Sequence, residues 1–150
     1  MEDSGKIQSQ LKDLFSSQKL AVLSTQSEGQ PYASLVSFVA TDDLKCLLFV
    51  TGRATRKYAN LAADSRAALL IDNRSNRDSD LHRAIAVTAT GFVDKIQGAE
   101  RDRLVDLYLS KHPYLDEFVN SPSNVFLRLK VESYFMVSKF QNVMVLHLLQ

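Results

Sequence analysis

The stretch LLFVTGRATRKYANLAADSRAALLI, from Leu47 to Ile71, joins an apolar run, a basic turn, a helical pattern and a second apolar run. The apolar runs, Cys46–Thr51 and Arg66–Asp72, have the length and the β-branched, aromatic and aliphatic residues of buried strands. Between them, Thr55–Ala63 contains good helix formers and no proline or glycine. The pattern therefore predicts a strand–turn–helix–strand unit.

The turn of this unit, TGRATRK, places Arg53, Arg56 and Lys57 near the predicted helix start. A helix start already has a partial positive charge and unpaired N–H donors, so these cations are unfavourable there unless an anion is bound. Phosphate accepts hydrogen bonds from arginine, lysine and backbone amides, and Thr51 and Thr55 add hydroxyls. The spacing fits two interpretations, a phosphate cradle and a solvated basic turn with Thr55 as the N-cap.

Helical and strand patterns alternate along the rest of the chain. Helices are predicted over residues 6–17 and 99–110, and strands over residues 19–25, 32–40, 84–93, 125–140 and 143–149. Short turns join the first three strands, which favours an antiparallel meander over a parallel βαβ sheet. We therefore expect one domain over residues 1–150, mainly β with helices (α+β) and barrel-like.

Composition excludes several classes of function. A net charge of +1 argues against binding nucleic acid through bulk charge, and the single cysteine, Cys46, excludes an internal disulfide. There is no long apolar run near the N-terminus, so we expect no membrane segment and a cytoplasmic protein. The scattered His82, His112 and His147 predict no metal site, and no pattern identifies a catalytic residue.

The run FVTGRATRKYANLAADSRAALL, Phe49–Leu70, resembles the FMN-phosphate segment of the pyridoxamine 5′-phosphate oxidase-like, FMN-binding split-barrel superfamily. In that family a threonine ends a strand, Ser/Thr-Arg-Lys opens a helix, and Asn/Asp-x-Arg-Ala-x-Leu-Leu forms the next strand. The resemblance implies a six-stranded antiparallel split β-barrel of FMN-binding type. It also implies FMN at a homodimer interface, and a small-molecule substrate or electron donor that stays unassigned.

The resemblance also implies positions for the cofactor-binding residues. The segment GQPYASLV, residues 29–36, is similar to the family strand whose backbone lies along the isoalloxazine ring. The C-terminal strand of the shorter family members can approach the flavin, which adds Phe140 and Gln141 as more distant contacts. The implied residues are Thr55, Arg56 and Lys57 at the phosphate, Val50 and Thr51 beside the flavin, Ser34, Leu35, Val36 and Ser37 along the ring, and Gln141.

The sequence departs from true pyridoxamine 5′-phosphate oxidases at their substrate residues. Their second strand opens with arginine and closes with lysine, whereas this chain has Ser34 and Val39, and it contains no tryptophan. We therefore expect an FMN-dependent oxidoreductase of unassigned substrate, similar to the haem-utilisation-like and uncharacterised branches. The alternatives are a non-catalytic module that binds FMN or haem and a barrel with an empty site; a deazaflavin also fits the cradle.

Overall fold

The computed structural model describes residues 2–139 and 141–148. The strands are β1 (Leu20–Ser27), β2 (Gln30–Ala40), β3 (Cys46–Gly52), β4 (Arg66–Asp72), β5 (Ala86–Lys95), β6 (Asn124–Ser138) and β7 (Asn142–His147). The helices are α1 (Glu2–Ser17), α2 (Arg56–Ala63), α3 (Asp80–Arg83), α4 (Ala99–Lys111), the 3₁₀ turn η1 (Pro113–Leu115) and α5 (Asp116–Asn120). Across these described residues, no helix is both long enough and apolar enough to cross a membrane.

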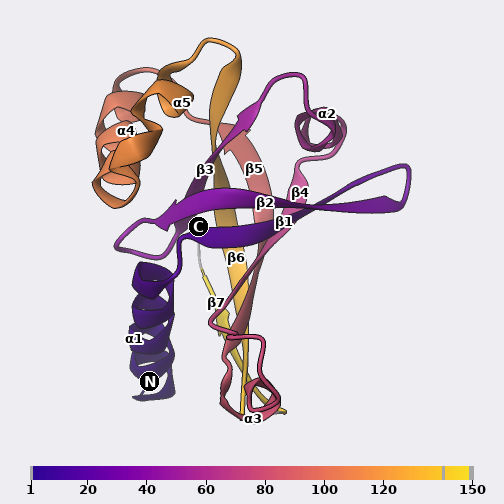
Figure 1. The fold of residues 1–150 in the computed structure, drawn as a ribbon, viewed down its shortest axis with the longest axis vertical. Coiled ribbons are helices and arrows are strands. Elements are labelled where there is room, and N and C mark those ends of the chain that lie inside the picture. The colour runs from indigo at the N-terminus through magenta and orange to yellow at the C-terminus, as the bar shows by residue number, and fades with distance from the viewer. Residues whose placement is uncertain (1, 140, 149–150) are drawn as a thin grey trace.

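The strands form one antiparallel sheet in the order β3-β2-β1-β4-β5-β6-β7, and β3 also pairs with β6. This additional pairing runs from Cys46↔Lys130 to Gly52↔Asn124 and closes the first six strands of that order into a barrel. The predicted six-stranded antiparallel barrel with helices is therefore confirmed. β7 lies alongside the far half of β6, outside the closed ring (Figure 1).

The main core fills the barrel and is completed by α1. Ile7, Leu11, Leu14 and Phe15 recur at helical spacing, so they share one face, which is buried among inward-facing strand residues such as Phe38 and Phe49. In Figure 1, α1 lies on one side of the β1–β2 ribbon, and α4 and α5 lie on the other. The leading helix predicted from this periodicity is present.

A second core lies on the outside of the barrel, under α4. Leu104, Val105 and Tyr108 of α4 pack against outward-facing residues of β2, β3 and β6, including Val39 and Phe126. α4 and the two short elements after it, η1 and α5, form a continuous helical excursion between β5 and β6. α3, η1 and α5 were not predicted, because elements of five residues or fewer are too short to display a period.

Gly91 marks an irregularity where β5 meets β6. The pairing register shifts between Thr90 and Gly91, as in a β-bulge. A Cβ atom at Gly91 would overlap the carbonyl oxygen of Lys130. The two backbones therefore approach closely at this point, where β6 passes from pairing with β3 to pairing with β7.

Candidate functional site

A cavity of about 580 Å³ lies on the barrel wall where β2 and β3 meet the start of α2. This volume is in the usual range for pockets that hold cofactors and other small molecules. Seven of the ten residues predicted to bind the cofactor line it: Leu35, Val36, Ser37, Val50, Thr51, Thr55 and Lys57. Residues from two strands and a helix start are thus brought together as the resemblance implied.

Two threonines connect the end of β3 to the start of α2. Thr55 is the N-cap of α2: its Oγ1 accepts from the N–H of Tyr58 at 3.3 Å and donates to the Gly52 carbonyl at 2.8 Å. Because the Thr55 proton is used in that bond, Thr51 is the donor in the 3.2 Å contact between the two hydroxyls. The interpretation of Thr55 as an N-cap is confirmed. Its hydroxyl shapes the turn and satisfies the Tyr58 N–H, one of the amides at the start of the helix.

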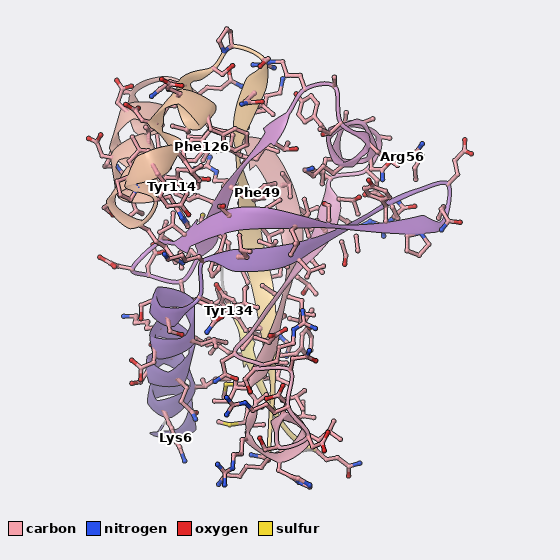
Figure 2. All side chains as sticks on the ribbon, viewed as in Figure 1. Lys6, Phe49, Arg56, Tyr114, Phe126 and Tyr134 are labelled. Atoms are coloured by element: carbon pink, nitrogen blue, oxygen red, sulfur yellow. The ribbon has the colours of Figure 1, made fainter. Side chains whose placement is uncertain are left out.

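The three cations of the turn take different positions. Arg53 braces the turn, since its Nε donates to the Pro122 carbonyl at 3.1 Å. Arg56 is exposed, outside the cavity wall, with its guanidinium carbon 5.9 Å from the ring centre of Tyr32, while Lys57 lines the cavity. Figure 2 shows Arg56 beside α2, across β3 from Tyr114. Neither Arg56 nor Lys57 has an ion-pair partner in residues 2–139 and 141–148, and the first turn of α2 has no acidic residue.

Ser34 and Gln141 are not in the cavity wall. Ser34 lies on β2, and its Oγ is buried with no hydrogen-bond partner in the described part of the chain. Gln141 follows the far end of β6, whereas Asn124, at the near end, lines the cavity. A strand from Asn124 to Ser138 spans roughly 45 Å at about 3.3 Å per residue. Gln141 therefore lies far from this cavity within one chain and stays a prediction, and Phe140 lies outside the described residues.

Five lining residues were not predicted: Leu20, Gly52, Leu115, Phe118 and Asn124. Gly52 adjoins the predicted Thr51 and could have been found from the motif. Leu115 and Phe118 come from η1 and α5, more than sixty positions after β3, and no local pattern links them to the turn. The Asn124 side chain holds α5 in place by donating from Nδ2 to the Phe118 carbonyl at 2.8 Å.

The two sides of the cavity differ in chemistry. The side at the helix start carries Thr51, Thr55 and Lys57, and the side formed by the helical excursion carries Leu115 and Phe118. Such a cavity suits a ligand with an anionic end and an apolar body. Within the described part of the protein, no three His, Cys, Asp or Glu side chains are grouped so that they could hold a metal ion.

Comparisons with known proteins agree with this fold. The family model described as Pyridoxamine 5′-phosphate oxidase matches residues 7–138, and the comparison with curated proteins found no match. The structure of a heme binding protein from Mycobacterium smegmatis is similar, with a TM-score of 0.80 and 20% identity over 89% of this chain and 55% of that one. Campylobacter jejuni ChuZ has a TM-score of 0.81 and 13% identity over 95% of this chain and 60% of its own.

An FAD-binding protein from Mesorhizobium loti is also similar, with a TM-score of 0.64 and 17% identity over 85% of this chain and 91% of that one. At these identities the likeness shows a shared fold. The chain spans little more than half the length of the heme binding protein.

Proposed function

Because this chain belongs to the pyridoxamine 5′-phosphate oxidase family, we propose that its cavity binds FMN, with the phosphate at the start of α2. One observation carries the proposal: seven residues that the resemblance assigned to the cofactor line a single cavity. The phosphate would be held by the first-turn amides of α2, by Lys57 from the cavity wall, and by Arg56 after its side chain turns from Tyr32.

The chemistry of the side chains fits this cofactor. Arg56 and Lys57 have no acidic partner in the described chain, so a phosphate would supply the missing negative charge. Leu35 and Phe118 offer apolar surface to the ring system, and Thr51 lies behind them with its proton used in the bond to Thr55. Bound FMN would supply redox chemistry that the side chains lack. The residues of the chain would orient the cofactor and exclude water from one side of it.

We propose a flavin-dependent oxidoreductase whose substrate and electron donor are unassigned. Pyridoxamine 5′-phosphate is a poor candidate substrate, because Ser34 and Val39 occupy the positions of the cationic residues of true oxidases. The second candidate is a non-catalytic FMN- or haem-binding module. We consider it because the chain shares its fold with a heme binding protein. The described cavity wall has no His, Cys, Met or Tyr that could be an axial haem ligand, which favours FMN.

We propose further that the functional unit is a homodimer with FMN at the interface. Leu20 and Leu35, at the cavity, are 53% and 64% exposed, which is unusual for leucines on adjacent strands of a barrel wall. A second chain covering them would enclose a cavity that is open in one chain. It would also give Gln141 a route to a flavin bound by the other chain.

The first test is the absorption spectrum of the purified protein and of the double variant Arg56→Ala, Lys57→Ala. We expect a two-band flavin spectrum, with FMN released on denaturation, and loss of FMN in the folded double variant. Each charge-assisted hydrogen bond lost should weaken binding by about 1.5–3 kcal/mol. A colourless wild-type protein whose melting temperature FMN does not change would contradict flavin binding.

The control for this test removes two exposed cations outside the cavity, Arg77→Ala with Arg103→Ala. It changes the net charge by the same amount, so it separates local contacts from bulk electrostatics. Full retention of FMN by the Arg56, Lys57 variant would refute the phosphate assignment. A Soret band in place of the flavin bands would support the haem-binding alternative.

A further inference from the structure

The last turn of α4 holds β2 directly behind the cavity. His112, at the end of α4, is fully buried, and its Nε2 lies 2.8 Å from the Phe38 carbonyl. A carbonyl oxygen only accepts, so Nε2 carries the proton and donates. Burial lowers the pKa of His112, which favours this neutral form. The bond fixes the β2 backbone next to Ser37, one of the cavity residues.

Tyr108 lies one helical turn before His112, with the two ring centres 5.0 Å apart. It is fully buried, and its hydroxyl has no hydrogen-bond partner in residues 2–139 and 141–148. Burial raises the pKa of Tyr108 to about 12, and the nearby Ser37 hydroxyl opposes part of that rise. Tyr108 packs in the outer core with Val39, which lies two residues after Ser37 on the same face of β2.

Ser37 stands at the boundary between the covered and open parts of the barrel wall. Three alternate residues of β2 share one face of the strand: Leu35 is exposed, Ser37 is half-buried at the cavity, and Val39 is buried under α4. Ser37 thus lies between the cavity and the outer core that contains Tyr108. A buried tyrosine hydroxyl normally has a partner, and the Ser37 hydroxyl can provide one.

We propose that Tyr108 is a positioning residue that donates to Ser37 Oγ and thereby directs the Ser37 proton into the cavity, toward an acceptor atom of the flavin ring. This inference rests on the proposed FMN site. Two hydrogen bonds in series polarise each other, so the Ser37 donor is strengthened by the tyrosine behind it. A donor aimed at the ring stabilises the more electron-rich reduced flavin over the oxidised form.

The test compares Ser37→Ala, Tyr108→Phe and the double variant by the midpoint potential and the visible spectrum of bound FMN. Each single variant should reduce the preference for reduced over oxidised FMN by about two- to tenfold, so that its midpoint potential becomes more negative. The double variant should match Ser37→Ala, because Tyr108 acts through Ser37. Ser37→Thr, which keeps a hydroxyl, should restore most of the effect.

The matched control is Tyr134→Phe, since Tyr134 is equally buried but donates to the Leu44 carbonyl at 2.7 Å, away from the cavity. It should lower the melting temperature and leave the potential unchanged. The inference is overturned if Tyr108→Phe leaves the potential unchanged, or if its effect adds fully to that of Ser37→Ala. A wild-type protein without affinity for FMN overturns the proposed function and, with it, this inference.

Discussion

At the scale of single residues, Gly91 shows how a missing side chain controls the pairing of two strands. A Cβ atom there would overlap the Lys130 carbonyl, so Gly91→Ala must push β5 and β6 apart. We expect the free energy of unfolding to fall by about 1–3 kcal/mol. Chemical denaturation measures this change. In contrast, Gly5→Ala in α1, where a Cβ atom meets nothing within 4 Å, should raise stability slightly, and an equal loss in both variants would contradict this explanation.

Lys111 is a second residue whose effect follows from its surroundings. Its Nζ donates to the Phe15 carbonyl at 2.8 Å and lies 3.8 Å from the ring centre of Phe38. Burial lowers its pKa from 10.5 to about 8. Between these pH values Lys111 retains its proton in the unfolded chain but has lost it in the folded chain. The contribution of Lys111 to the free energy of unfolding therefore rises with pH.

The variant Lys111→Met tests this effect. The free energy of unfolding of the wild type, relative to that of the variant, should increase between about pH 8 and pH 10.5. Urea denaturation of both proteins across this range gives the difference, in which the titration of other groups cancels. Partial exposure of the amine will reduce the size of the change. A difference that stays flat or falls with pH would show that the amine is not desolvated in the folded protein.

At the scale of elements, the helical excursion from α4 to α5 has two structural roles. It covers the outer face of the barrel through Tyr108 and its neighbours, and it presents Phe118 to the cavity. If FMN binds as proposed, Phe118→Ala should weaken FMN binding by about three- to tenfold, because an aromatic contact is lost. Inorganic phosphate should inhibit FMN binding as strongly in this variant as in the wild type, since the substitution does not change the residues proposed to hold the phosphate of FMN.

Titration of the flavin fluorescence measures both effects. Tyr114→Ala is the control: Tyr114 lies in the same excursion and is 65% exposed, but it does not line the cavity (Figure 2). The role assigned to α5 would be wrong if the two alanine variants bound FMN equally well.

At the scale of the whole molecule, the β6–β7 ribbon exposes apolar side chains in opposed pairs. Phe135 faces Val145 and Val137 faces Val143 across the two strands, and all four are at least 36% exposed. Such a patch is typical of a surface that another chain covers. With the exposed leucines at the cavity, it supports the proposed homodimer.

We therefore expect Val143→Lys with Val145→Lys to produce a folded monomer that retains FMN poorly. Both side chains are exposed in one chain, at 57% and 44%, so lysine is tolerated until a partner must bury it. Light scattering coupled to size-exclusion chromatography measures the molar mass. Leu81→Lys, at a 66% exposed position in α3, is the control and should remain dimeric. A wild-type protein that is monomeric in this measurement would exclude the homodimer.

Much of the fold could be predicted because its signals are local. β4 begins and ends at the predicted residues, and the other long elements lie within a few residues of their predicted ranges. Periodicity, capping by Thr55 and the turn before Arg56 act over a few residues, so they can be recognised in one short stretch. The helix start with its unpaired cations was found in the same way.

The sequence by itself thus determined the strand–turn–helix–strand unit and the chemistry of its turn. Only the tertiary structure decided the closure of β3 on β6, and the separate positions of Arg53, Arg56 and Lys57. It also decided that Leu115 and Phe118 face that turn. These features depend on register and on the path of a long connection, which bring together residues far apart in the chain. Local sequence patterns do not encode such contacts, because many paths of the chain are compatible with the same periodicity.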